Sequence, residues 1–242
     1  FCATTASIVS GTLAERIKIW PFFLFVAILT GVIYPIEMGW QWGGGWLAEM
    51  GFSDFAGSTI VHSVGGWAAV VGCLILGPRA GKYSSDGKIS PIAGANMPLA
   101  CLGTFILWFG WFGFNGGSEL MVSNVGEANA VSMVFVNTNA SAAGGVIAAL
   151  LLSKIMFGKF DLSMGLNGAI AGLVSITAEP LAPAPEQAAL IGAVGGLGSS
   201  IKSLIRRSNE LETNNDAIDK FLAYLRPRGK RTQEFFDIER EN

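Results

Sequence analysis

His62, the single histidine of the 242-residue chain, is the side chain best suited to proton chemistry. It lies eight residues into the uncharged run 55–78, which is long enough to place it deep in a membrane. An ionisable group at that depth is energetically costly and usually faces a pore or cavity. The alternative is a neutral imidazole that hydrogen-bonds to a neighbouring helix. No acidic or cysteine partner lies near it in the sequence, so we expect no metal site.

Asp54 stands at the mouth of the same run. A carboxylate there can accept hydrogen bonds from the free N–H groups of a helix start. It can also give a cation vestibule its charge and shape, and the two roles are compatible.

Three tryptophans, Trp40, Trp42 and Trp46, surround the glycine triplet 43–45. Tryptophans gather at membrane interfaces, but an indole face also binds small cations through its quadrupole. Composition does not choose between these explanations. Further along the chain, Ser118 adds a hydroxyl group at the end of an aromatic and glycine-rich stretch.

The composition predicts that membrane helices position these residues. Hydrophobic residues make up 51% of the chain, charged residues only 14%, and the mean hydropathy is +0.48. A soluble domain carries about a quarter charged residues. The body lacks the basic footprint of a nucleic-acid-binding protein, and its three cysteines have neither paired nor metal-ligand spacing.

Charge-free runs of about 20 residues predict membrane helices. Seven such runs occur, and we expect the first helix to be incomplete. Their ranges are 1–14, 19–36, 55–78, 89–118, 128–153, 162–178 and 187–201. Glycines four residues apart within the later runs, such as Gly168 with Gly172 and Gly192 with Gly196, predict close contact between helix backbones.

Basic residues fall on alternate connections between these runs. Lys and Arg follow the first, third and fifth runs, whereas connections 37–54, 119–127 and 179–186 contain neither. Because basic residues accumulate on the cytoplasmic side, residue 1 is predicted outside and the C-terminal tail inside.

The tail differs from the body in charge. Residues 202–242 hold 17 of the 34 charged residues, so we divide the chain into a transmembrane region, 1–201, and a charged cytoplasmic tail, 202–242. An amphipathic stretch around Ile218 and a basic cluster around Arg228 could bind acidic lipid headgroups, or the tail could come from a frameshift or from joined gene fragments.

Six stretches carry a recognisable order. They are Gly11-Thr12-Leu13-Ala14-Glu15-Arg16, Trp42-Gly43-Gly44-Gly45, Asp54-Phe55-Ala56-Gly57 with His62, Trp111-Phe112-Gly113-Phe114-Asn115 with Ser118, Phe135-Val136-Asn137-Thr138, and Gly168-Ala169-Ile170-Ala171-Gly172-Leu173-Val174. Each is weak alone, but the ordered set, from Phe1 to about Gly198, resembles the ammonium transporter family, the relatives of the Rh glycoproteins.

The resemblance implies an all-α, polytopic membrane helix bundle, in which this chain supplies the third to ninth of eleven helices and is incomplete at both ends. It also implies a homotrimer in the plasma (inner) membrane, with one hydrophobic pore in each protomer. A PII-family signal protein is an expected partner on the cytoplasmic side, and no cofactor is expected.

The resemblance also implies roles for single residues. Phe1, Trp42 and Ser118 would form an outer site that recruits ammonium, and Phe1 with Phe114 would form the gate below it. Asp54 would maintain the vestibule. His62 would be the first of two pore histidines, where ammonium separates into ammonia and a proton. No other histidine of this chain can serve as the second.

Three hypotheses follow. The first is a fragment of an ammonium transporter, not an enzyme, that does not transport without its missing helices. The second is an ammonium sensor or regulatory membrane protein, or a truncated product that does not transport. The third is an intramembrane hydrolase, which ranks last because no nucleophile motif is present.

Overall fold

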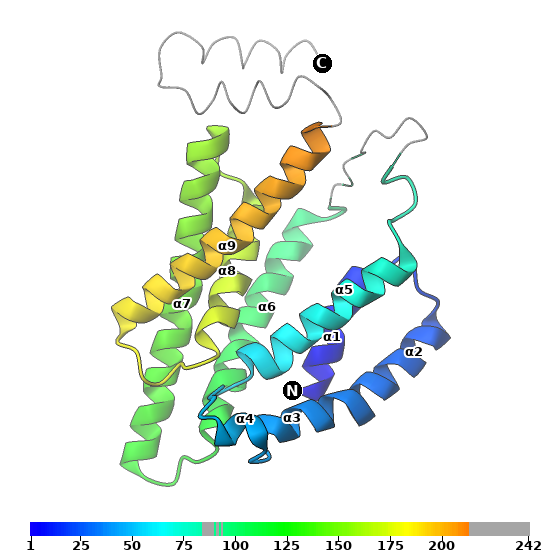
Figure 1. Ribbon diagram of the computed structural model, residues 1–242. Helices are drawn as coiled ribbons and strands as arrows, with labels where there is room; N and C mark the ends of the chain where they lie inside the picture. The colour runs from blue at the N-terminus through cyan, green and yellow to red at the C-terminus, as the bar shows by residue number, and fades with distance from the viewer. Residues whose placement is uncertain (84–89, 91, 93, 213–242) are drawn as a thin grey trace.

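The computed structural model describes residues 1–83, 90, 92 and 94–212, and the regular elements there are helices (Figure 1). Each of the seven predicted runs contains a helix. The elements are α1 (Cys2–Leu13), α2 (Ile19–Ile28) continuing through η1 (Leu29–Ile33) into α3 (Tyr34–Gln41), α4 (Trp46–Glu49), η2 (Ser58–Ser63) continuing into α5 (Val64–Leu76), α6 (Met97–Gly116), η3 (Gly117–Glu119), α7 (Val125–Phe157), α8 (Leu162–Ile176) and α9 (Pro185–Glu212).

The fourth predicted helix begins later than expected. The uncharged run starts at residue 89, but α6 starts at Met97 because Asn96 caps it, its side-chain oxygen accepting from the Leu99 N–H at 2.9 Å. Pro98 occupies the first turn, where its missing N–H is harmless. Among the described residues of this run, 90, 92 and 94–96 are therefore not helical, because hydropathy does not detect helix caps.

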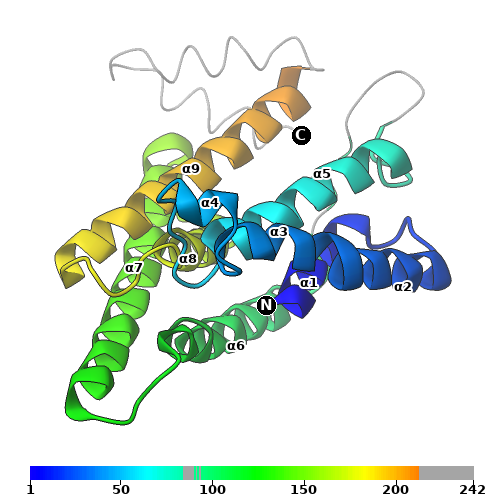
Figure 2. The same ribbon diagram turned by 60° about the horizontal axis from the view of Figure 1, so that its bottom comes forward.

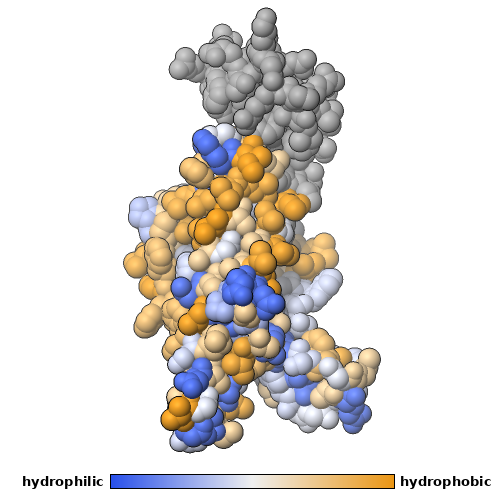
Figure 3. All heavy atoms as spheres, turned by 90° about the vertical axis from the view of Figure 1, so that its left-hand side faces the viewer, coloured by the Kyte–Doolittle hydropathy of each residue, from blue (hydrophilic) through white to orange (hydrophobic). Residues whose placement is uncertain are grey.

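Four described segments are long and apolar enough to cross a membrane: Ile19–Glu49, Ser58–Leu76, Met97–Glu119 and Val125–Phe157. The shorter helices α1 and α8 are also apolar. Many large apolar side chains are exposed, among them Val136 and Ile147 of α7 and Val194 of α9. Apolar residues cover the middle of the face in Figure 3. This surface suits lipid, so the chain is a membrane protein.

Close backbone contacts join α7, α8 and α9. A Cβ atom on Gly168 or Gly172 of α8 would collide with the α7 backbone, and one on Gly192 or Gly196 of α9 would also strike α7. The predicted contacts at these four glycines are confirmed. Ser141 adds a hydrogen bond from its hydroxyl to the Gly172 carbonyl at 2.8 Å.

A second packed group contains α1, α5 and the long helix from α2 to α3, and α6 lies between the two groups (Figures 1 and 2). Helix α6 packs on α7 and α8. On its other side, Phe114 packs against Ile60 and Val61 of η2. Side chains of both groups therefore meet around the end of α6.

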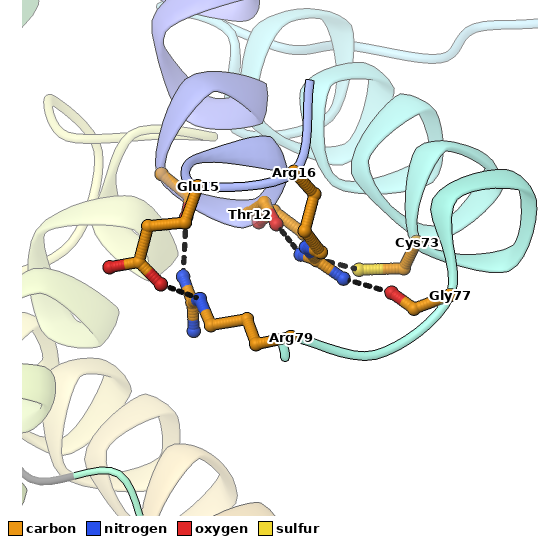
Figure 4. Close-up of polar contacts among 7 residues, drawn as sticks. Thr12, Glu15, Arg16, Cys73, Gly77 and Arg79 are labelled. Carbon is orange, nitrogen blue, oxygen red and sulfur yellow. Dashed lines mark hydrogen bonds and ion pairs between the residues drawn. The ribbon is translucent and has the colours of Figure 1, made fainter. Parts of the chain in front are cut away.

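The neighbouring ends of α1 and α5 are tied together by arginines (Figure 4). The Arg16 guanidinium donates to the carbonyl oxygens of Thr12 and Gly77, and lies 3.8 Å from the Cys73 sulfur. Arg79 donates to the Gly11 carbonyl at 3.1 Å and pairs with Glu15 at 3.0 Å. A cation at two helix C-termini also opposes their partial negative charge.

We expect Arg16→Met to lower the free energy of unfolding by about 1–3 kcal/mol, because two carbonyls lose a charged donor. The control is Glu15→Gln, which removes only an exposed ion pair worth about 0–1 kcal/mol. Thermal unfolding in detergent measures both variants. Equal effects would contradict the conclusion that Arg16 holds the ends of α1 and α5 together.

Candidate functional site

The loop before η2 is organised by Asp54, whose side chain is 1% exposed. One carboxylate oxygen accepts from the N–H groups of Gly57 and Ser58, both at 2.9 Å. The other accepts from Thr59 at 2.7 Å and Ile60 at 2.9 Å. Asp54 is thus the cap of this helix start, as one of the two sequence explanations proposed. The loop also needs Gly57, since its φ of 99° favours glycine and a Cβ would lie 2.5 Å from Val61.

His62 is held in one tautomer. Its Nδ1 lies 2.9 Å from the Gly57 carbonyl oxygen, and because a carbonyl only accepts, Nδ1 carries the proton. The Gly57 oxygen also accepts from the His62 backbone N–H at 3.1 Å, a contact that the π-helical turn η2 creates. The other ring nitrogen, Nε2, keeps its lone pair and can accept a proton or a hydrogen bond.

A row of aromatic rings joins His62 to the start of the chain. The His62 ring stacks on Trp111, with centroids 5.0 Å apart, and meets Phe114 edge-on at 5.7 Å. Phe114 contacts Phe1 at 4.4 Å, and Phe1 contacts Trp42 at 5.4 Å. Four of the six predicted site residues are thus brought together: Phe1 just before α1, Trp42 just after α3, Phe114 of α6 and His62 of η2.

The other two predicted residues lie beside this row. The Asp54 carbonyl accepts from the Trp42 indole N–H at 2.8 Å, so the loop that Asp54 caps also anchors Trp42. The Ser118 hydroxyl donates to the Phe114 carbonyl at 2.8 Å. This leaves the Ser118 oxygen as an acceptor, the character that a cation site requires.

Behind the row lie Trp111, Asn115 and Thr138, which the sequence offered as motif residues without a role in the site, and Thr177, which it did not single out. The Trp111 indole N–H donates to the Thr177 hydroxyl at 2.8 Å, and Thr177 in turn lies 3.2 Å from the Asn115 amide oxygen. Asn115 donates to Thr138 at 3.0 Å. This buried network fixes the ring on which His62 stacks. The place of Trp111 beside Phe114 follows from the sequence, because the two residues are three positions apart and share one helix face. Its hydrogen bond to Thr177 does not, because the two residues are 66 positions apart.

Metal chemistry has no support within the described part of the chain, where no group of three or more His, Cys, Asp or Glu side chains could hold an ion. The site offers aromatic faces, one imidazole lone pair and few other polar atoms. Aromatic faces attract cations, whereas apolar walls disfavour a bare charge. The arrangement can therefore attract a small cation and remove a proton from it.

The fold and the site define a polytopic helical membrane protein with an aromatic site between two helix groups. A model of the Ammonium Transporter Family matches residues 1–211. The chain belongs to this family.

Individual relatives of the chain point to the same family. The chain is 45% identical over 206 residues to ammonium transporter Amt2 of Archaeoglobus fulgidus, covering 81% of this chain and 43% of the relative. It is 40% identical over 230 residues to a putative ammonium transporter of Synechocystis, covering 90% and 41%. The chain thus spans less than half the length of these relatives.

Solved structures show the same fold. A sensor Amt protein matches with a TM-score of 0.78 at 39% identity, over 89% of this chain and 53% of the other. Mep2 of Candida albicans matches with a TM-score of 0.74 at 33% identity, over 85% and 45%. Both proteins therefore share sequence as well as fold with this chain.

Proposed function

We infer that the full-length protein containing this chain transports ammonium across a membrane. The observation that carries this proposal is the row of rings from Trp42 through Phe1 and Phe114 to His62. It combines an aromatic surface that favours a cation with an imidazole that can accept a proton. Family membership supports the same substrate.

The proposed sequence of events begins at Trp42, Phe1 and Ser118. Ring faces hold ammonium through their quadrupoles, and the Ser118 oxygen accepts one of its N–H groups. The edge contact between Phe1 and Phe114 closes the path from this site toward His62, so the two rings must separate before the substrate can pass. Asp54 keeps Trp42 and the start of η2 in register, and its negative charge favours the cation.

Beyond the gate, an apolar environment penalises an intact cation. His62 Nε2 accepts a hydrogen bond from ammonium or ammonia, while Nδ1–H stays bonded to Gly57. Transfer of one proton from ammonium to His62 Nε2 leaves neutral ammonia, which proceeds, and an imidazolium that must give up this proton before the next ammonium arrives. Potassium has no proton to lose, so this step discriminates between two cations of similar size.

The assembly and location belong to the same proposal. A homotrimer in the plasma membrane, with residue 1 outside and the tail inside, is consistent with the exposed apolar surface and with the basic residues near Arg16 and Arg79. A PII-family protein would bind on the cytoplasmic side. The proposed tail, 202–242, is described only as helix backbone to Glu212, and the stretches around Ile218 and Arg228 lie outside the described residues.

Uptake of labelled methylammonium by cells that lack their own ammonium transporters tests the proposal. We expect the full-length protein to restore uptake and His62→Ala to reduce it at least tenfold. Trp67→Ala is the control, because Trp67 follows His62 by five residues and is 70% exposed. A folded, membrane-inserted wild-type protein without uptake would refute transport.

A sensor is the second candidate, favoured by the structural likeness to a sensor Amt protein. In that case ammonium occupancy would change the conformation or a partner of the cytoplasmic side. Ammonium-dependent cross-linking at that side, in a protein without uptake, would favour the sensor over the transporter.

A further inference from the structure

The connection between α8 and α9, drawn in yellow in Figure 1, is held by one buried side chain of α7. The amide nitrogen of Asn137 donates to the carbonyl oxygens of Pro180 at 2.9 Å and Pro183 at 2.7 Å. Asn137 is fully buried. Both neighbours are carbonyl oxygens, which only accept, so the amide atom that faces them must be the nitrogen. Asn137 thus uses both of its N–H groups to fix this connection.

The other amide atom of Asn137 supports the same conclusion. Its oxygen is buried and has no hydrogen-bond partner among the described residues, and an unpaired buried acceptor destabilises a protein. An apolar side chain of similar shape, such as leucine, would avoid this cost but would leave the two proline carbonyls without their donor. The two N–H bonds therefore explain why an amide suits this position.

The same connection receives the loop that carries the site. The backbone N–H of Phe55 donates to the Ala178 carbonyl at 2.8 Å, and that of Ala56 donates to the Thr177 carbonyl at 3.0 Å. Thr177 is the C-cap of α8, and Ala178 begins the connection that Asn137 holds. These two bonds join the loop before η2 to the packed group of α7, α8 and α9.

The position of His62 depends on this joint in two ways. Its Nδ1–H is bonded to the carbonyl of Gly57 at 2.9 Å, one residue after Ala56. Its ring stacks on Trp111, and the Trp111 indole N–H is bonded to the Thr177 hydroxyl at 2.8 Å. The loop that holds the imidazole and the ring on which it stacks are therefore both fixed to the end of α8.

We propose that Asn137 is a positioning residue for the step at His62, although it touches no substrate. The inference rests on the proposed function for the nature of that step. Asn137 holds the connection after α8, the carbonyls of Thr177 and Ala178 hold the loop, and the loop holds the imidazole. Loss of the amide should therefore loosen a segment that lies far earlier in the chain and in the other helix group.

Amide hydrogen exchange of the purified full-length protein, followed by mass spectrometry, tests this coupling without an assay of transport. We expect Asn137→Leu, which has a similar shape and no N–H donor, to speed exchange in peptides covering residues 55–60 at least tenfold. Asn137→Ser keeps one donor and leaves room for a water. It should give a smaller increase in the same peptides, and it provides the test if Asn137→Leu does not fold.

Ser141→Ala is the matched control. Ser141 is also fully buried on α7 and also donates to a carbonyl of its neighbour α8, that of Gly172 at 2.8 Å, but this bond lies away from the connection. The variant should leave exchange over residues 55–60 unchanged.

Uptake of methylammonium, normalised to folded protein in the membrane, gives the second measurement. A purely structural role would change the amount of folded protein and leave its KM unchanged. We expect Asn137→Leu to raise KM at least threefold, because the loop also anchors the Trp42 indole through the Asp54 carbonyl. Ser141→Ala should keep the wild-type KM.

Three results would overturn the positioning role of Asn137. They are unchanged exchange over residues 55–60 in the folded variants, equal effects of Asn137→Leu and Ser141→Ala, and faster exchange with wild-type KM and maximal rate. Absence of uptake by the folded wild-type protein would refute transport alone, because exchange measures the coupling to the loop directly.

Discussion

Asp54→Ala should lower the free energy of unfolding by about 2–6 kcal/mol, because an unpaired buried donor costs about 1–3 kcal/mol and two of the four N–H groups that Asp54 binds, those of Gly57 and Ile60, are fully buried. The start of η2 should lose its geometry, and with it the position of His62. Thermal unfolding of the purified full-length protein and methylammonium uptake measure the two effects.

Two variants make this expectation specific. Asp54→Asn keeps the volume but replaces one accepting oxygen by an NH2 group, so its effect should be intermediate. Asn124→Ala removes the exposed cap of α7, a single bond to Glu127 N–H at 3.0 Å, and should cost about 1 kcal/mol. If Asp54→Ala were no more harmful than Asn124→Ala, the cap would not organise the site.

Gly192→Ala should destabilise the protein by about 3 kcal/mol, since overpacking a tight contact costs about 1–3 kcal/mol and sometimes more. The added Cβ would overlap the Ser141 carbonyl oxygen of α7, and Ser141 is itself bonded to Gly172 of α8. All three helices must therefore shift.

The control lies on the same helix. A Cβ on Gly198 meets nothing within 4 Å, so Gly198→Ala should be neutral or stabilising by up to about 1 kcal/mol through helix propensity alone. Melting temperatures of the two variants in detergent compare them directly. Similar melting temperatures would show that α7 and α9 are not packed through Gly192.

Several features of the site could be named before the fold was known. The run around His62 marked an intramembrane imidazole, and Asp54 preceded a helix start at capping distance. The grouping of Phe1, Trp42 and Phe114 came from the family resemblance, because no local pattern relates residues from three helices. Their roles in recruitment and gating remain predictions that the uptake experiments test.

Other features were not recognised from the sequence. The start of α6 at Met97 depends on the cap at Asn96, which hydropathy does not detect. The link from Trp111 to Thr177 joins two helices through side chains whose spacing carries no periodic pattern. The bonds from Asn137 to Pro180 and Pro183 exist only because the connection between α8 and α9 lies against α7.

The sequence by itself determined the solvent and the secondary structure of this protein. Long apolar runs require a membrane, and in a membrane the backbone must satisfy its own hydrogen bonds, so each run becomes a helix. Only the tertiary structure decided which polar atoms find partners: Asp54 is fully bonded, His62 keeps one free nitrogen, and Asn137 retains a free oxygen. The physical reason is that hydropathy is a property of each residue by itself. A hydrogen bond between side chains instead requires two atoms that different helices bring within about 3 Å of each other.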